Sequence, residues 1–341
     1  MVSPATTEPS PGQALQRGNK LASSITTTAE PSPFQLTAVI RQVRPKQWAK
    51  NAIVFAPLLF SGNLTSLERF DQALLCAVAL CAMSSAVYTI NDIVDIKGDK
   101  AHPKKRFRPL AAEQITIPQA ILLVIFLLLG GFTCAFLVRP TIDLICLTYL
   151  IINLLYSFRL KNQPIIDILC IASGFVLRAV AGAAAVHVAP SAWFLMCTTF
   201  GALFLGLEKR RYELVLLAEK SSEHRQVLRK YSLSLIQRLE SLIAPSLLAT
   251  YSFYTFQSTS AHHGQWMMIT IPIVLYGVMR YQYLSDSGEA TGTPEEILWK
   301  DKPIQLTILI WIVACGLVIY GNPGSWVENV SYTVDSFRQL H

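Results

Sequence analysis

The sequence predicts an all-α, multi-pass membrane protein built as a bundle of about nine transmembrane helices. Of its 341 residues, 52% are hydrophobic and only 15% are charged, and the mean hydropathy is +0.40. A soluble globular domain normally carries about 25% charged residues. Apolar stretches of the length a bilayer requires recur along the chain, and Lys and Arg gather between them.

The two ends of the chain differ in composition from the part between them. Residues 1–33 are rich in Ser, Thr, Pro and Ala and contain no apolar signal-peptide core, so we expect a disordered cytoplasmic tail. Residues 34–322 form the predicted transmembrane domain, and residues 323–341 form a short tail expected outside the cytoplasm. The domain begins with an interfacial helix within 34–51, and Pro45 suits the first turn of the helix that follows. The predicted spans are 50–62, 70–92, 115–138, 141–158, 163–186, 191–207, 244–258, 266–284 and 304–321.

The connections between these spans predict the orientation of the protein. With the N-terminus in the cytoplasm, the inner loops carry most of the Lys and Arg, and the short outer connections are nearly free of both. This asymmetry predicts a cell-membrane protein whose polar segments share the cytoplasmic face. The net charge of +7 is then explained by these loops and by anionic partners, without nucleic acid.

An acidic segment stands at the cytoplasmic end of the second predicted span, in NDIVDIKGDKAHPKKRFRPLAA (91–112). Asn91, Asp95 and Asp99 are spaced i, i+4 and i+8, and Asp92 precedes Asp95 by three residues. On a helix these side chains lie along one face, where like charges repel, so we expect a multivalent cation such as Mg²⁺ between them. The alternative is a solvated helix end whose aspartates pair with neighbouring lysines.

Cations follow at once, and others precede the first span. Each of these residues taken singly fits the ordinary excess of positive charge in cytoplasmic loops. Taken together, and beside a metal site, they suit the binding of phosphates. These residues are Lys104, Lys105, Arg106 and Arg108 in the loop, and Arg41, Arg44, Lys46 and Lys50 before the first span.

Three further polar segments fall on the same predicted face. YSFRLKNQPIIDI (156–168) contains Tyr156, Arg159, Lys161 and Asp167, and Arg178 lies deeper in the following span, either as a structurally paired arginine or as an anion partner. EKRRYEL (208–214) adds Lys209, Arg210 and Arg211, with Glu213 able to orient one of them or with the set acting only as a stop-transfer signal. TPEEILWKDK (293–302) holds Glu295, Glu296 and Asp301 on a short predicted helix, and we assign no chemistry to it.

These clusters predict a transferase. A diphosphate could be held by Mg²⁺ on one side and by Lys and Arg on the other, while a lipid tail lies between apolar helices. No Walker A, G-x-G-x-x-G or Ser/His/Asp pattern is present. A transporter is the alternative of another class, but the charges gather at one face and paired broken helices are not evident.

At these residues the chain resembles the UbiA superfamily of intramembrane prenyltransferases, over roughly residues 38–322. The first motif of that family, N-D-x-x-D-x-x-x-D, is matched by Asn91, Asp92, Asp95 and Asp99. RPKQWAKN, KRFRPLAA, YSFRLKNQPIIDI and KRRYEL are similar to one branch, whose members transfer 5-phosphoribose from phosphoribosyl pyrophosphate to a decaprenyl-type polyprenyl phosphate in arabinogalactan precursor synthesis. The second motif departs from the D-x-x-x-D of the aromatic prenyltransferases, since Lys161 and Asp167 stand there with a proline between them.

The resemblance implies roles for the polar residues. Asp92, Asp95 and Asp99 would bind Mg²⁺, and Asn91, Tyr156 and Lys161 would act on the substrate. The phosphate-binding and supporting residues would be Arg44, Lys46, Lys105, Arg106, Arg108, Asp167, Arg178, Lys209 and Arg210. The alternative within the family is transfer of an isoprenyl chain from its diphosphate to an aromatic or tetrapyrrole acceptor.

Overall fold

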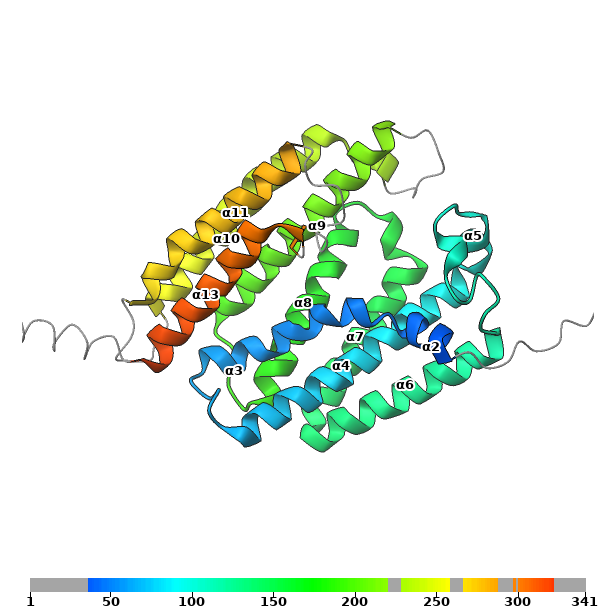
Figure 1. The fold of residues 1–341 in the computed structure, drawn as a ribbon, viewed down its shortest axis with the longest axis horizontal. Helices are drawn as coiled ribbons and strands as arrows, with labels where there is room; N and C mark the ends of the chain where they lie inside the picture. The colour runs from blue at the N-terminus through cyan, green and yellow to red at the C-terminus, as the bar shows by residue number, and fades with distance from the viewer. Residues whose placement is uncertain (1–35, 220–227, 258–265, 288–296, 299, 322–341) are drawn as a thin grey trace, which may run out of the picture.

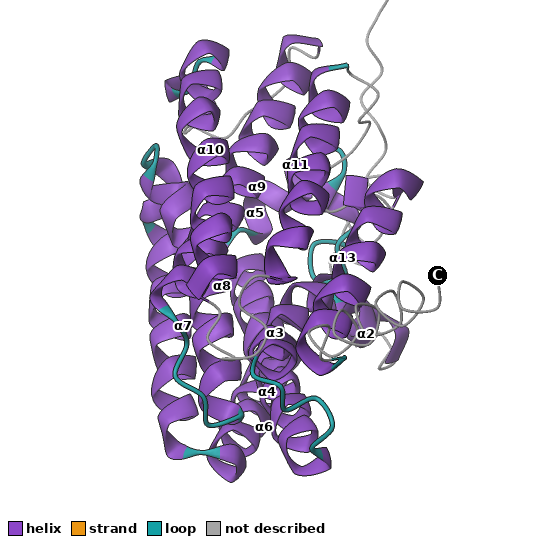
Figure 2. Ribbon diagram, turned by 90° about the vertical axis from the view of Figure 1, so that its left-hand side faces the viewer, coloured by secondary structure: helices purple, strands orange, loops and turns teal. Residues whose placement is uncertain are grey.

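A computed structural model describes residues 36–219, 228–257, 266–287, 297–298 and 300–321. Every regular element in these ranges is a helix, and Figure 2 shows helices joined by short loops, so the predicted all-α class is confirmed. The predicted tails, and the segment with Glu295 and Glu296, lie outside the described residues. The elements are α2 (Leu36–Val43), η1 (Pro45–Phe55), α3 (Ala56–Phe60), α4 (Leu67–Val94), α5 (Ile96–Ala101), η2 (Lys105–Phe107), α6 (Ile117–Val138), α7 (Pro140–Phe158), η3 (Leu160–Asn162), α8 (Ile166–Ala185), α9 (Ala192–Glu219), η4 (Leu228–Lys230), α10 (Leu233–Gln257), η5 (Trp266–Thr270), α11 (Ile271–Asp286) and α13 (Lys302–Tyr320), where η marks a 3₁₀ helix.

Five of the described helices are long and apolar enough to cross a membrane: α4, α6, α7, α8 and α13. The protein is therefore an integral membrane protein. Among the described residues, five of the nine predicted spans satisfy this criterion of length and apolarity. The predicted first span, 50–62, is divided between η1 and α3. The helix predicted at 191–207 continues to Glu219 as α9, and the one predicted at 244–258 begins at Leu233 as α10. Both extensions carry charged residues, which the hydropathy used for the prediction excludes.

The helices form two groups that meet along α8 and α9. Figure 1 shows α4, α6 and α7 on one side of α8, and α10, α11 and α13 beyond α9. The largest buried cluster fills the first group, and includes Leu80 and Met83 of α4 and Cys146 of α7. The second group has its own core, in which Phe204 of α9 packs with Val278 of α11.

The 3₁₀ helix η1 lies on α4 and α8 and brings a cationic segment to their ends (Figure 1). It runs for eleven residues, whereas 3₁₀ helices rarely exceed three or four residues. Trp48 Nε1 donates to Ser85 Oγ of α4 at 3.0 Å, and Arg178 Nε of α8 donates to Asn51 Oδ1 at 2.6 Å. A Cβ atom at Gly182 of α8 would lie 2.2 Å from the Val54 carbonyl oxygen, so glycine permits the close approach.

Candidate active site

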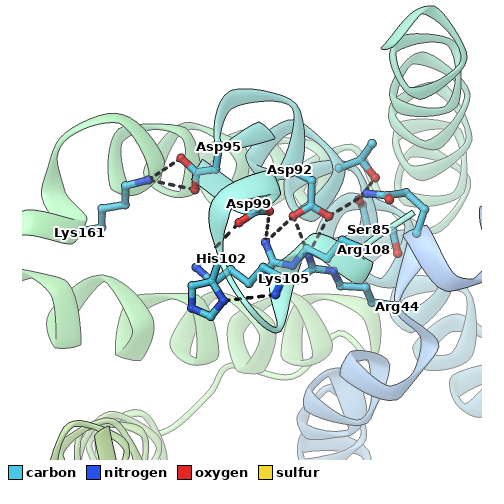
Figure 3. Close-up of polar contacts among 11 residues, drawn as sticks. Arg44, Ser85, Asp92, Asp95, Asp99, His102, Lys105, Arg108 and Lys161 are labelled. Atoms are coloured by element: carbon cyan, nitrogen blue, oxygen red, sulfur yellow. Dashed lines mark hydrogen bonds and ion pairs between the residues drawn. The ribbon is translucent and has the colours of Figure 1, made fainter. Parts of the chain in front are cut away.

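Asp92 is the centre of a buried ion-pair network at the C-terminal end of α4 (Figure 3). Its side chain is only 3% exposed. Arg44 Nη2 donates to both carboxylate oxygens, at 2.6 and 2.7 Å, and Arg108 Nη1 donates to Oδ1 at 3.0 Å. Gln42 Nε2 donates to Oδ2 at 2.9 Å. An apolar location for a carboxylate is costly unless it is paired, and these donors compensate that cost.

Asp99, on α5, belongs to the same network. It is as buried as Asp92, and its Oδ2 accepts a 2.6 Å bond from Arg108 Nη1. Lys105 Nζ lies 3.9 Å from its other oxygen. One nitrogen of Arg108 therefore contacts the carboxylates of both Asp92 and Asp99.

Asp95 points elsewhere, because it lies at the junction where α4 ends and α5 begins. Its side chain is 44% exposed, and its two oxygens lie 3.1 and 3.2 Å from Lys161 Nζ. The expected single acidic face is therefore divided into an Asp92–Asp99 pair and a separate Asp95 (Figure 3). Over the ranges that the structure describes, no three His, Cys, Asp or Glu side chains are arranged as a metal-binding group.

The residues nevertheless fit Mg²⁺ in their chemistry. Carboxylate and amide oxygens are the hard ligands that this ion prefers. Asp92 Oδ1 and Asp99 Oδ2 converge on one cationic atom, Nη1 of Arg108. The buried Asn91 Oδ1 has no hydrogen-bond partner among the described residues. A metal ion could take the position between the two carboxylates if Arg108 moved toward a phosphate.

The other predicted phosphate-binding residues differ in their exposure. Lys46 and Arg106 are exposed, and the Arg106 guanidinium lies 4.9 Å from the centre of the Phe107 ring. Tyr156, at the end of α7, and Lys209, on α9, are half-buried.

Asp167 and Arg210 are buried from solvent, with residue exposures of 0% and 1%. Arg210 Nε of α9 donates to Asp167 Oδ2 of α8 at 2.8 Å, and Arg210 also pairs with Glu213. Tyr231, which the sequence analysis did not single out, donates to Asp167 Oδ1 at 2.8 Å. Nothing local in the sequence marks this tyrosine, because it lies 64 positions from its partner.

Arg178 is also buried, at 5% exposure. Its Nε, Nη1 and Nη2 donate to Asn51 Oδ1, the Gly174 carbonyl oxygen and the Tyr149 hydroxyl, at 2.6, 2.8 and 2.8 Å. Each of its three nitrogens thus has a protein acceptor. These contacts join α8 to η1 and α7. This is the structurally paired arginine, one of the two alternatives that the sequence left open for Arg178.

An apolar cavity of about 390 Å³ lies between the two helix groups. Ile53 of η1 and Phe175 of α8 line it, with Gly201 of α9, Tyr254 of α10 and Trp311 of α13. Its size is near the lower end of the range for small-molecule sites. The lining suits a hydrocarbon chain.

Known proteins share both the sequence pattern and the fold. The model of the UbiA prenyltransferase family matches residues 53–293. A decaprenyl-phosphate phosphoribosyltransferase from Mycolicibacterium smegmatis is 33% identical over 305 residues, which cover 86% of this chain and 96% of that protein. One from Corynebacterium glutamicum is 31% identical over 291 residues, covering 84% and 87%.

Solved structures agree on the architecture. A UbiA homologue from Archaeoglobus fulgidus, bound to DMAPP and Mg²⁺, superposes with a TM-score of 0.64 at 18% identity, covering 82% of this chain and 98% of that one. A digeranylgeranylglyceryl phosphate synthase superposes with a TM-score of 0.60 at 16% identity, covering 83% and 98%. At such identities the similarity concerns the fold, whereas the family model and the relatives in sequence concern the family itself. This chain is therefore a membrane transferase that belongs to the UbiA prenyltransferase family.

Proposed function

We propose that this protein transfers 5-phosphoribose from phosphoribosyl pyrophosphate to a polyprenyl phosphate and releases diphosphate. The observation that carries the proposal is the pairing of Asp92 and Asp99 with Arg108, and of Asp95 with Lys161, in one polar region. Binding of a magnesium diphosphate can exchange these partners, because the carboxylates prefer the metal and the freed cations prefer the phosphates. The names of the relatives that cover most of this chain support the phosphoribosyl donor.

The chemistry joins two anions. A phosphate oxygen of the lipid forms a bond to C1 of the ribose, while the bond from C1 to the diphosphate oxygen breaks and its electron pair leaves with the diphosphate. The nucleophile is already ionised, so no general base is required. The protein must overcome the repulsion between donor and acceptor, which is an electrostatic and positioning task.

The cations of this site suit that task. Arg108 and Lys105 lie beside Asp99 and can bind the diphosphate oxygens as the carboxylates exchange partners. Arg44 is fixed at Asp92, and Lys161 comes from the opposite side at Asp95. Mg²⁺ held by Asp92, Asp99 and Asn91, with Asp95 nearby, would supply charge neutralisation for the leaving diphosphate. Lys46, Arg106 and Tyr156 remain candidates for the lipid phosphate and for the ribose 5-phosphate and hydroxyls.

The apolar cavity is the proposed site for part of the polyprenyl chain. Its 390 Å³ can hold only a few isoprene units, so the remainder of a long chain would extend into the bilayer. The positive-inside asymmetry favours a cell-membrane location with the N-terminus and the polar site on the cytoplasmic side, where phosphoribosyl pyrophosphate is found. The product would serve cell-envelope glycan synthesis of the arabinogalactan type.

The test is a transfer assay with purified protein in detergent. Labelled phosphoribosyl pyrophosphate, a polyprenyl phosphate and Mg²⁺ are supplied, and the lipid phase is extracted. The variant is Asp92→Asn, and the matched control is Asp71→Asn, an exposed aspartate about 30 Å away along the same helix. We expect a labelled, acid-labile lipid from the wild type and the control, and none from the variant or with EDTA.

Absence of product with several chain lengths, together with transfer from an isoprenyl diphosphate to an aromatic acceptor, would reject the phosphoribosyl proposal. It would assign the protein to the prenyltransferases of the same family. Equal activity of Asp92→Asn and wild type would reject the assignment of Asp92 as a Mg²⁺ ligand.

A further inference from the structure

We infer that Asp167, Arg210 and Tyr231 are positioning residues that hold the loop carrying Lys161 against Asp95. The role of Lys161 in diphosphate binding rests on the proposed function, whereas the contacts that hold its loop do not. The sequence predicted that Asp167 and Arg210 would belong to the ligand-binding set. Their burial and mutual pairing indicate an indirect role instead.

The network links three separate parts of the chain. Asp167 stands in the first turn of α8, Arg210 is in the second half of α9, and Tyr231 follows η4. Asp167 accepts from Arg210 through Oδ2 and from Tyr231 through Oδ1, each at 2.8 Å. Both carboxylate oxygens are therefore occupied by protein donors. Asp167, Arg210 and Tyr231 are no more than 6% exposed, so a phosphate could reach these side chains only if the surrounding helices repacked.

Tyr231 extends the network into the loop that carries Lys161. Its hydroxyl donates to Asp167 and accepts the backbone N–H of Ile165 at 2.6 Å. Ile165 has φ of 69° and ψ of −48°, a positive-φ backbone conformation that is strained for a β-branched residue. The hydrogen bond from its N–H is thus made at a strained residue that the surrounding structure must hold in place.

A second contact holds the same loop at its middle, at Asn162. Lys230 Nζ donates to the Asn162 carbonyl oxygen at 3.4 Å, next to Lys161. The loop between α7 and α8 is therefore attached to the segment before α10 at Asn162 and at Ile165. Lys161 Nζ projects from it to Asp95 (Figure 3). Loss of the buried attachment would let Lys161 move while leaving its charge intact.

The experiment is a double-mutant cycle between Tyr231→Phe and Lys161→Gln. The readout is the affinity for inorganic diphosphate with Mg²⁺, measured by calorimetry on the full chain in detergent, beside the transfer assay. We expect Tyr231→Phe to weaken diphosphate binding about tenfold, because the variant loses both hydrogen bonds of the Tyr231 hydroxyl, to Asp167 and from Ile165. In the Lys161→Gln background the same change should have no further effect, because the group that it positions is gone.

Tyr320→Phe is the matched control. The Tyr320 hydroxyl also bridges backbone groups, donating to the Leu59 carbonyl oxygen and accepting the Leu64 N–H, each at 3.0 Å. It belongs to α13 and ties that helix to α3 and the following connection, so we expect diphosphate affinity to remain unchanged. If Tyr231→Phe does not fold, Lys230→Ala replaces it, with a smaller effect in the same direction.

Equal losses from Tyr231→Phe with and without Lys161 would overturn the inference, since a merely structural residue gives additive effects. Unchanged affinity in the single variant would do the same. Failure of the proposed function has a different signature: diphosphate binding shows the expected coupling, but the wild type forms no phosphoribosyl lipid.

Discussion

Arg44 Nη2 lies 2.6 and 2.7 Å from the two carboxylate oxygens of Asp92, although the residues are 48 positions apart in the chain. The backbone of Arg44 has φ of 54°, in the left-handed region that non-glycine residues seldom occupy. It stands immediately before η1, whose first residue is Pro45. The ion pair thus attaches the strained start of η1 to the end of α4, at the carboxylate for which we propose a metal-binding role.

Arg44→Lys should impair the reaction even though the charge is kept. A lysine ammonium cannot reproduce the planar guanidinium geometry, and a charge-assisted hydrogen bond contributes about 1.5–3 kcal/mol. We therefore expect kcat/KM for phosphoribosyl pyrophosphate to fall by roughly ten- to a hundredfold. Arg41→Lys, at an exposed arginine bonded to Gln114, is the control and should stay within twofold. Equal behaviour of the two variants would contradict this role.

Removal of Arg108 should make the stability of the protein depend on Mg²⁺. Arg108→Ala leaves the buried Asp92 and Asp99 without the cation they share, and loss of one partner of a buried pair costs about 3–5 kcal/mol. We expect a lower melting temperature in detergent, partly restored by millimolar Mg²⁺. Lys100→Ala, which breaks an exposed pair with Glu113, should show neither effect. A melting temperature that falls and does not respond to Mg²⁺ would argue against a metal ion between these carboxylates.

Gly182→Ala should displace η1. The added Cβ would meet the Val54 carbonyl oxygen at 2.2 Å, and the obstructing atom belongs to the backbone and cannot rotate away. We expect a loss of stability of at least about 2 kcal/mol, together with reduced activity, since η1 carries Arg44 at its start. Gly130→Ala on α6, where nothing lies within 4 Å, should leave stability unchanged or slightly improved. Normal melting of Gly182→Ala would show that η1 can move outward without loss.

Filling the apolar cavity should weaken the binding of the lipid substrate and leave the binding of phosphoribosyl pyrophosphate unchanged. Gly201 lines the cavity, and a Cβ there would be 3.8 Å from its nearest neighbour, a Leu247 methyl carbon. Gly201→Leu should raise KM for a long-chain polyprenyl phosphate about tenfold, with KM for phosphoribosyl pyrophosphate nearly constant. Gly130→Leu is the control for helix insertion and folding. A rise in both KM values would indicate distortion of the bundle rather than occupation of a chain-binding site.

Glu240 should make stability fall as the pH rises. Burial, with Glu208 nearby, raises the pKa of Glu240 to about 7, and Arg211 opposes this only in part. The residue lies on α10, before the predicted span at 244–258, and Asp286 of α11 adds to the negative charge around it. The folded state therefore holds a proton that the unfolded state releases near pH 4.5, so this stability is lost as the pH rises through about 7.

The corresponding measurement is the melting temperature in detergent between about pH 5 and pH 8. Glu240→Gln should flatten the decline and raise the melting temperature by a few degrees at the upper end. Asp71→Asn, at an exposed site, should follow the wild type. A parallel decline in Glu240→Gln and wild type would assign the pH dependence to other groups.

The acidic segment illustrates what could be predicted locally. Asp92 and Asp99 are seven residues apart, close to two helical turns, so their side chains return to the same side. Asp95 is three residues from Asp92, about 60° away from that direction, and the change from α4 to α5 occurs at this residue. Helical geometry therefore accounts for the Asp92–Asp99 pair, whereas the junction between α4 and α5 gives Asp95 its separate direction.

Composition, hydropathy and the 91–112 motif were sufficient for the all-α membrane class, the UbiA family and the polar region at one end of α4. The membrane class and the polar region depend on local periodicity and on the high cost of placing charge in a bilayer, and both can be evaluated residue by residue. The family was indicated by the resemblance of the sequence motifs. The pairing of Lys161 with Asp95, of Gln42 with Asp92 and of Arg210 with Asp167 was decided only by the tertiary structure. A charged residue at a helix end is equally compatible with solvent, a ligand or a buried partner. The packing of distant helices decides which of these it meets.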